Sequence, residues 1–252
     1  MIDELLSLRV IAASAADRDL FRHAATAAKV PVEVLEAETA GGACGLLARG
    51  VDLVLLDGKL GDEQVARLVA AARAAPKAPF TVLLAEPEAA APFATDALAA
   101  KPADLEAAKR FVNAATRIRL PSRVLVVDDS STMRAIVRKT LAATRFPMHV
   151  TEAAQGLDAI EIARSTAFDI VIIDYRMPGF SGLETIAEFR REKRPVTFVL
   201  ITSARDEGLV ERARAQGAAF LKKPFFPADV ENVLCGSYGL RALSPKPDAK
   251  PA

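Results

Sequence analysis

The 252-residue chain contains no tryptophan, only two cysteines and no excess of either charge. Cys44 and Cys235 lie too far apart for a CxxC or a metal-ligand spacing, so we interpret them as small buried thiols in a reducing compartment. The 33 basic side chains balance 32 acidic ones, and no basic stripe typical of a nucleic-acid-binding protein stands out. The composition therefore argues against a cysteine metal centre and against a nucleic-acid partner.

Long hydrophobic runs are missing as well. Runs such as residues 170–173 are far too short to span a bilayer. The first five residues, Met1 to Leu5, are acidic in character and lack the basic stretch that opens a signal peptide. We therefore expect a cytoplasmic protein with no membrane insertion.

The apolar residues that are present come in short bursts separated by amphipathic stretches. Residues 124–127, 170–173 and 198–201 are continuous aliphatic runs, as in strands covered on both faces of a parallel sheet. Between the first two runs, a serine pair at 130–131 precedes a helical stripe of apolar side chains, which is made of Met133, Ile136, Val137 and Leu141. Alternation of strand and helix predicts a doubly wound α/β fold.

The chain carries an internal duplication. Residues 51–57 match residues 168–174 position by position, with an offset of 117 (174 − 57). Arg9-Val10-Ile11 corresponds in this pattern to Arg123-Val124-Leu125, and Lys101-Pro102 to Lys223-Pro224. We predict two domains of the same fold, at residues 1–118 and 123–240, followed by a disordered Pro/Lys-rich tail at 241–252.

Polar side chains follow the predicted strands of the second copy. Asp128 and Asp129 follow its first strand, Asp174 ends its third, Thr202 ends its fourth and Lys223 follows its fifth. The carboxyl ends of parallel strands open onto one crevice, so we expect these groups to converge. Three carboxylates repel one another, and a hard divalent cation such as Mg²⁺ relieves that repulsion. The hydroxyl and the ammonium can then hold a phosphoryl group on a carboxylate.

Each of these residues also has an ordinary structural interpretation. An aspartate after an aliphatic strand is often only a helix cap or a turn former, and Lys-Pro is a common loop dipeptide. Thr202 can simply finish a strand, and an aromatic such as Phe220 is more often part of a core than of a switch. The occurrence of all the polar groups at strand ends of one sheet is what favours a site.

Four stretches carry a more specific resemblance, and they occur in the order Val124–Arg134, Asp174–Pro178, Thr202–Ala204 and Lys223–Phe225. With these motifs, residues 123–237 resemble a response-regulator receiver domain, in the style of the single-domain chemotaxis regulator. The resemblance implies a flavodoxin-like (βα)5 fold with a five-stranded parallel sheet, and the duplication implies two such domains.

The resemblance also implies a role for each motif residue. Asp174 is the phosphoacceptor, Asp129 binds Mg²⁺ directly and Asp128 binds it through water. The backbone carbonyl of Arg176 is a further ligand of the metal, as is Asp174 itself. Thr202 and Lys223 contact the phosphoryl oxygens, Phe220 and Thr202 form the switch, and the Lys223-Pro224 bond is cis.

The first copy lacks the acidic pair. Aligning residues 10–13 with residues 124–127 places Ser14 and Ala15 at the positions of Asp128 and Asp129, whereas Asp57 and Lys101 keep the acceptor and lysine positions. Alanine at 85 and leucine at 98 replace Thr202 and Phe220, and Pro87 and Pro92 predict a truncated fourth helix. We predict an Asp57–Lys101 ion pair and a pseudo-receiver that serves as a docking or dimerisation module.

These features predict a phosphorelay protein rather than a conventional enzyme. A sensor histidine kinase or a phosphotransfer protein would donate the phosphoryl group, and a downstream protein target or a second copy of the chain would sense it. No DNA-binding or enzymatic output is expected after residue 240. Two alternatives stay open: a phosphate sink or relay intermediate, and the regulatory part of a larger protein such as a diguanylate cyclase.

Overall fold

The computed structural model describes residues 6–11, 14–37, 40–47, 50–86, 94–191, 195–203 and 208–243. The chain divides into two compact units, and we describe each by itself. The first unit consists of Met1–Arg119 together with Tyr238–Ala252, and the second of Leu120–Ser237. Across the described ranges, no helix is both long enough and apolar enough to cross a membrane.

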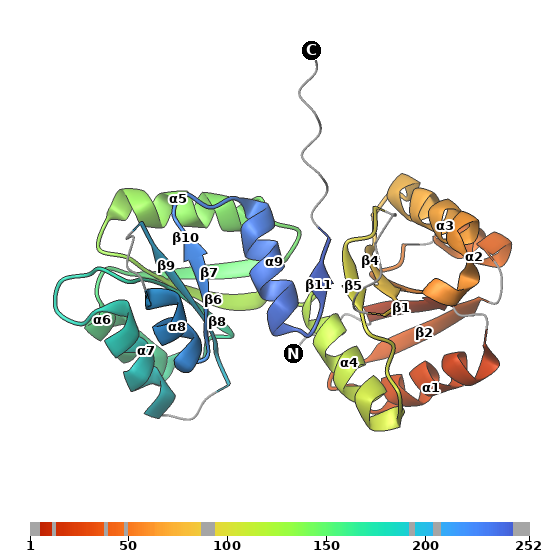
Figure 1. Cartoon of the computed structure of the whole chain (residues 1–252), viewed down its shortest axis with the longest axis horizontal. Coiled ribbons are helices and arrows are strands. Elements are labelled where there is room, and N and C mark those ends of the chain that lie inside the picture. Colours follow the sequence, from red (N-terminus) through yellow and green to blue (C-terminus); the bar gives the residue numbers. More distant parts are fainter. Residues whose placement is uncertain are drawn as a thin grey trace, which may run out of the picture. The chain divides into compact units, whose positions relative to one another are not determined.

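The second unit alternates five strands with five helices. Its strands are β6 (Ser122–Val127), β7 (Met148–Ala153), β8 (Ile170–Asp174), β9 (Thr197–Thr202) and β10 (Ala218–Lys222). Its helices are α5 (Ser131–Ala142), α6 (Gly156–Ser165), α7 (Gly182–Arg191), α8 (Leu209–Ala215) and α9 (Pro227–Ser237). All strand pairs are parallel in the order β10-β9-β8-β6-β7, with α5 and α9 on one face and α6 to α8 on the other (Figure 1). This is the doubly wound five-stranded fold that the sequence predicts.

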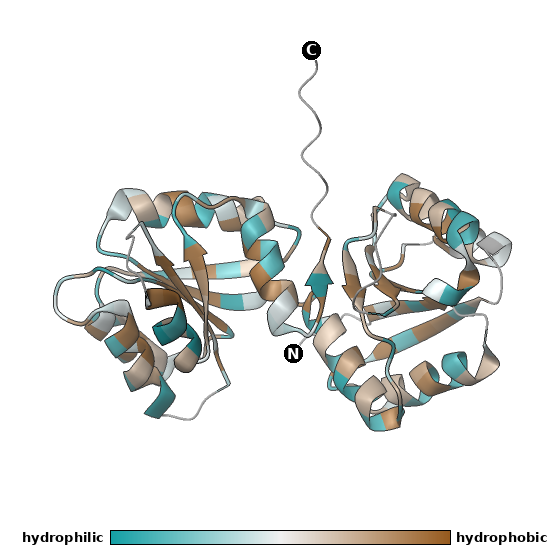
Figure 2. Ribbon diagram, viewed as in Figure 1, coloured by the Kyte–Doolittle hydropathy of each residue, from teal (hydrophilic) through white to brown (hydrophobic). Residues whose placement is uncertain are grey.

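The sequence explains these elements locally. The aliphatic runs form the central strands, which are buried on both faces and hydrophobic along their length (Figure 2). Ser130 begins α5 as predicted, because its hydroxyl accepts the Met133 N–H at 3.3 Å. Val137 and Leu141 of the predicted stripe are buried, but Ile136 is 49% exposed, so the buried stripe of α5 is narrower than the sequence suggests.

The first unit repeats the same pattern with one additional strand. Its strands are β1 (Leu6–Ile11), β2 (Val32–Ala37), β3 (Leu53–Asp57), β4 (Phe80–Leu84), β5 (Ala97–Ala99) and β11 (Arg241–Ala242). Its helices are α1 (Ala15–Thr26), α2 (Ala40–Leu47), α3 (Asp62–Ala74) and α4 (Leu105–Arg117), with the short 3-10 helix η1 (Gly58–Leu60) after β3. The sheet order is β11-β5-β4-β3-β1-β2, and α1 packs against α4 while α2 packs against α3.

Strand β11 corrects two predictions. It pairs antiparallel with β5, Arg241 opposite Leu98 and Ala242 opposite Ala97, so this sheet has six strands and is not purely parallel. The prediction of a disordered tail over 241–252 is therefore wrong for residues 241–243. Residues 244–252 lie outside the described residues. Composition pointed to a tail, whereas backbone pairing at an open sheet edge gives these residues an ordered place.

Strand pairing also corrects the alignment of the two copies. Ile11 pairs with Leu56, just as Val127 pairs with Ile173, and each partner immediately precedes an acceptor-position aspartate. Ile11 therefore corresponds to Val127, so Ala12 and Ala13, rather than Ser14 and Ala15, stand where the second copy has its acidic pair. An apolar run without alternation does not specify its own register, which is why the sequence alignment slipped by two residues.

Matching hydrogen bonds at the N-terminal ends of β1 and β6 support the corrected register. The N–H of Ser7 donates to Asp52 Oδ2 at 3.0 Å, and the N–H of Arg123 donates to Asp169 Oδ2 at 2.8 Å. Ser7 thus corresponds to Arg123, and the predicted match of Arg9 with Arg123 is wrong. Either way the first copy lacks the carboxylate pair. The predicted truncation of its fourth helix rests on residues 87–93, which lie outside the described residues.

Candidate functional site

The carboxyl ends of the second sheet carry four of the predicted residues, and the side chains of three of them are in direct contact. Asp128 follows β6, Asp174 and Thr202 are the last residues of β8 and β9, and Lys223 follows β10. Asp128 is 2% exposed, Asp174 7% and Thr202 1%. Burial of two carboxylates requires a partner for their charge, because an unpaired buried charge is very costly.

Lys223 is that partner. Its Nζ donates to Asp128 Oδ2 at 2.7 Å and to Asp174 Oδ1 at 2.6 Å. The second oxygen of each carboxylate is held by backbone: Ser130 N–H donates to Asp128 Oδ1 at 3.0 Å, and Arg176 N–H to Asp174 Oδ2 at 2.7 Å. The Lys223-Pro224 peptide is cis, as the resemblance predicts, and the N–H of Lys223 donates to the Thr202 carbonyl at 2.8 Å.

Two carboxylates, those of Asp128 and Asp174, share the single ammonium of Lys223. Burial raises the pKa of the Asp174 carboxyl, Lys223 partly offsets that rise, and the neighbouring Asp128 charge adds to it. Burial pulls the pKa of Lys223 down, but its hydrogen bonds to Asp128 and Asp174 outweigh burial and leave the pKa above its usual value. The ammonium is therefore firmly charged, while the Asp174 carboxylate is left in surroundings that disfavour its negative charge.

The third predicted carboxylate is placed differently. Asp129 follows Asp128 directly, and its side chain is exposed. In the part of the chain that the structure describes, no group of three or more His, Cys, Asp and Glu side chains is placed to hold a metal ion. The convergence expected for three carboxylates is thus met by Asp128 and Asp174, which are joined by a lysine.

One residue of the site carries a contact that sequence reasoning missed. Arg134, on the first turn of α5, donates from its guanidinium to the carbonyl oxygen of Asp128 at 2.8 Å and to that of Asp129 at 3.4 Å. The same side chain bonds Glu152 Oε2 of β7 at 3.1 Å. Arg134 therefore ties the turn that carries the acidic pair to the neighbouring strand. The sequence offers no signal for this, because the acceptors are backbone carbonyls.

The loop after Asp174 is shaped by a close backbone approach. The N–H of Gly182, at the start of α7, donates to the Tyr175 carbonyl at 3.0 Å. A Cβ at position 182 would lie 2.3 Å from the Asp174 carbonyl oxygen and 2.8 Å from Leu200 Cδ1, so only glycine fits. The loop also lines a 460 Å³ cavity, formed by Tyr175, Arg176, Met177, Pro178 and Ser181. This cavity is therefore lined in part by the residues that directly follow Asp174.

Phe220 lies in β10 opposite Leu200, half-buried and packed against the core of this unit. Its switching role stays a prediction. In the first unit, the corresponding Leu98 lies in β5 opposite Leu83 and is 1% exposed. The side chain at this position is therefore fully buried in the first unit and only partly buried in the second.

The first unit contains a lysine bridge of its own. Lys101 Nζ lies 3.0 Å from Asp57 Oδ2, which confirms the predicted ion pair, and Asp57 Oδ1 accepts the Lys59 N–H at 3.1 Å. The second partner of the lysine is Asp17 Oδ2 at 2.5 Å, from the first turn of α1. Burial lowers the pKa of Lys101, but the hydrogen bonds to Asp17 and Asp57 outweigh it and raise the pKa. Asp17 is therefore the second carboxylate partner of Lys101, as Asp128 is of Lys223, but Asp17 lies on a helix and Asp128 directly after a strand.

Comparison with known proteins bears on the second unit. A family model described as response regulator receiver domain matches residues 124–234. The chemotaxis protein CheY-3 of Vibrio cholerae serotype O1 is 34% identical over 115 residues, which are 44% of this chain and 88% of that protein. The chain belongs to the response-regulator receiver family. The chemotaxis protein CheY of Pseudomonas aeruginosa is also 34% identical, over 41% of this chain and 85% of its own length.

One solved structure spans both receiver-like units. It is described as a putative two-component system response regulator/GGDEF domain protein, and it covers 92% of this chain and 96% of its own. The sequence identity is 22% and the TM-score is 0.50, so the likeness concerns the fold. Two successive α/β units of this kind therefore occur together in another response regulator.

Proposed function

We propose that the second unit is a phosphoacceptor module in which Asp174 takes a phosphoryl group from a sensor histidine kinase or a phosphotransfer protein. The observation that carries the proposal is the Lys223 ammonium, which lies within hydrogen-bonding distance of both Asp128 and Asp174. Asp174 Oδ attacks the phosphorus of a phosphohistidine, the P–N bond breaks as the P–O bond forms, and the imidazole leaves with a proton. Lys223 neutralises charge that develops on the phosphoryl oxygens.

The donor set of this site fits Mg²⁺. The carboxylates of Asp128 and Asp174 are oxygen donors that share a single lysine, and the carbonyl of Arg176 and the exposed carboxylate of Asp129 are further oxygen donors close by in the sequence. A bound divalent cation would supply charge neutralisation for the transferring group. The raised pKa of Asp174 is consistent with a site that lacks positive charge until a cation binds.

In the phosphorylated state, the second unit would alter its protein contacts. The new group carries a charge of about −1.5 to −2, and it would compete for Lys223 and attract the Thr202 hydroxyl. Movement of Thr202 leaves room for Phe220 to change rotamer, and the surface around β10 changes with it. The chemistry is self-phosphorylation with slow loss of the phosphoryl group, so we class the protein as a signalling protein rather than a conventional enzyme.

The first unit is proposed to be a pseudo-receiver that docks a partner or a second copy. Its lysine is satisfied by Asp17 and Asp57, and the positions of the acidic pair are held by Ala12 and Ala13. With one lysine set against two carboxylates, this site has less excess negative charge than the second unit, and it lacks the ligands that would anchor a divalent cation.

Labelling with a small acyl phosphate in the presence of Mg²⁺, followed by peptide mapping, tests both assignments. We expect the label on Asp174, none when Mg²⁺ is omitted, and none in Asp174→Asn. Asp57→Asn serves as the matched control and should label like the unaltered protein. Label on Asp57 comparable to that on Asp174 would contradict the pseudo-receiver assignment, and labelling of Asp174→Asn elsewhere in the second unit would contradict the acceptor.

The two alternative functions and an effector function predict different consequences of phosphorylation. A phosphate sink gains no partner on phosphorylation, whereas an effector gains affinity for a protein target or for itself. Size-exclusion chromatography with and without beryllofluoride measures self-association directly. For a regulatory part of a larger protein, the same change should appear as altered activity of an attached output domain.

A further inference from the structure

The chain leaves the second unit at the end of α9 and returns to the first unit's sheet after three residues. Ser237 ends α9, Tyr238, Gly239 and Leu240 connect, and β11 begins at Arg241. The first unit is therefore discontinuous in sequence, and the second unit is inserted between α4 and β11. The backbone of residues 238–240 therefore links α9 directly to the sheet of the first unit.

Strand β11 closes the edge of that sheet with a small number of contacts. Its ladder with β5 is two residues long, and the N–H of Leu243 donates to the Asp96 carbonyl at 2.9 Å. Leu240 is 3% exposed, and Leu243 packs against the core of the first unit. The strand thus has a defined position but few hydrogen bonds, and segments with few contacts open most easily.

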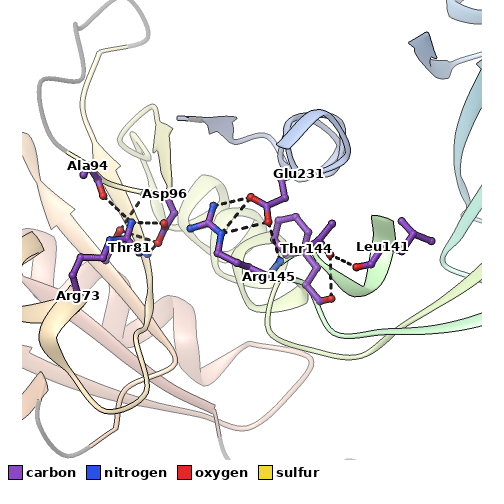
Figure 3. Close-up of polar contacts among 9 residues, drawn as sticks. Arg73, Thr81, Ala94, Asp96, Leu141, Thr144, Arg145 and Glu231 are labelled. Carbon is purple, nitrogen blue, oxygen red and sulfur yellow. Dashed lines mark hydrogen bonds and ion pairs between the residues drawn. The ribbon is translucent and has the colours of Figure 1, made fainter. Parts of the chain in front are cut away.

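The sheet edge on which β11 pairs is held by several hydrogen bonds. The side chain of Asp96, just before β5, is buried, and its Oδ2 accepts the N–H of Thr81 at 2.7 Å and the Thr81 hydroxyl at 3.0 Å. Arg73 of α3 reaches Asp96 Oδ1 at 2.5 Å and the Ala94 carbonyl at 2.7 Å (Figure 3). Charge-assisted bonds of this kind hold the β4–β5 edge in place.

The other end of the connection is also anchored. Glu231 of α9 accepts the Arg145 N–H at 2.8 Å and lies 2.9 Å from the Arg145 guanidinium (Figure 3). Val230, Leu234 and Cys235 of the same helix are buried in the second unit. The β11–β5 ladder is two residues long, whereas α9 is anchored by three buried side chains and by the Glu231–Arg145 pair, so the ladder is the part that yields under a displacement.

We propose that β11 is a strap that phosphorylation of Asp174 loosens from β5, so that the first unit's sheet edge opens in response to the state of the second unit. This inference rests on the proposed function of Asp174. Lys223 is held by the Asp174 carboxylate, and a phosphoryl group on that carboxylate forces the ammonium to new oxygens. Only residues 224–226 separate Lys223 from the start of α9 at Pro227.

The three-residue connection then passes the movement on. Three residues span at most about 10 Å when extended, so a connection this short absorbs little displacement of α9. A slip of β11 by one residue reverses the direction of its side chains, and Leu243 would leave the core. The strap therefore opens when α9 moves relative to the sheet of the first unit.

Amide hydrogen exchange of the full-length protein, read with and without beryllofluoride plus Mg²⁺, tests the proposal. Protection of the loop at residues 174–182 reports occupation of the acceptor site. Exchange at the Leu243 N–H and in residues 96–99 reports the strap. We expect both readouts to change together, with exchange at Leu243 faster by at least about tenfold, and neither to change in Asp174→Asn.

A longer connection provides the matched variant. Six Gly and Ser residues inserted between Gly239 and Leu240 should let α9 move without pulling on β11, so the acceptor loop still responds while Leu243 stays protected. Accelerated exchange at Leu243 in the lengthened protein overturns transmission through the connection. In the unaltered protein, a responding loop with unchanged Leu243 overturns the strap and leaves the proposed function intact. A loop that fails to respond overturns the proposed function itself.

Discussion

Lys101 Nζ of the first unit donates to Asp17 Oδ2 of helix α1 at 2.5 Å, just as Lys223 Nζ of the second unit donates to Asp128 Oδ2 after strand β6. The two lysines occupy matching positions after the fifth strands, yet their second partners come from different elements. The first site therefore pairs a lysine with two carboxylates, as the second site does, without acidic residues directly after its first strand. This relationship makes the first unit a test of what the lysine bridge contributes apart from phosphorylation.

Replacing Asp17 with Asn should destabilise the first unit, because Lys101 would keep only Asp57 in a mostly buried setting. We expect a loss of about 1 kcal/mol in the free energy of unfolding. Urea unfolding followed by amide exchange in β3 measures it. Asp19→Asn, which breaks the exposed 2.6 Å pair with Arg22 on the same helix, is the control and should have little effect. Equal effects of the two variants would contradict a special role for Asp17.

The lysine bridge of the first unit predicts a dependence of stability on alkaline pH. The folded pKa of Lys101 lies above its usual 10.5, so its contribution to stability is complete below pH 10.5 and is lost as the pH rises through the folded value. Lys101→Met removes that contribution. The stability difference between the unaltered protein and this variant should therefore shrink above pH 10.5. A difference that stays constant from pH 8 to pH 12 would be inconsistent with the bridge.

Lys223→Met should slow phosphorylation of Asp174 more than it affects folding. Loss of a positioned donor to developing charge lowers the rate by about 100-fold. The measurement is the initial rate of labelling by a small acyl phosphate at saturating Mg²⁺. Lys222, the preceding residue, has an exposed side chain, so Lys222→Met carries the same chemical change without the site contact. Similar rates for the two variants would remove Lys223 from the mechanism.

Gly182→Ala should damage the second unit through the loop that carries the acceptor. The added Cβ would meet the Asp174 carbonyl oxygen at 2.3 Å, so the start of α7 must move. We expect a destabilisation of about 1–3 kcal/mol, measured by denaturant unfolding, together with slower labelling of Asp174. Gly236→Ala in α9 is the control, because a Cβ there meets nothing within 4 Å. Unchanged stability of Gly182→Ala would show that the loop is not constrained as described.

Much of the second unit could be predicted because its signals are local. Aliphatic runs mark buried parallel strands, and the polar residue that ends each run lies at the edge where such strands open. Asp128, Asp174, Thr202 and Lys223 were located in this way, and the structure joins Lys223 to both aspartates through its side chain and to Thr202 through its backbone N–H. Asp129 was expected to converge with them, but its side chain is exposed. Two residues that follow the same strand cannot be told apart in the sequence by which of them will be buried.

The remaining features depend on contacts between residues distant in the chain. The register of β1 slipped by two residues in the alignment, since an unbroken apolar run fits its neighbours in more than one way. Asp17 gave no signal because its partner is 84 residues away. Arg134 gave none because it binds backbone carbonyls, which every residue has.

The order and type of residues along the chain were enough to predict the α/β class, the duplication, the family and the chemistry available to the second unit. The pairing of β11 with β5 and the contact of Asp17 with Lys101 become visible only in the folded chain. Both depend on which backbone edge and which ammonium happen to lie within reach once the sheets have formed. Hydrogen bonds and ion pairs act over a few ångströms in space, and separation along the chain places no limit on them.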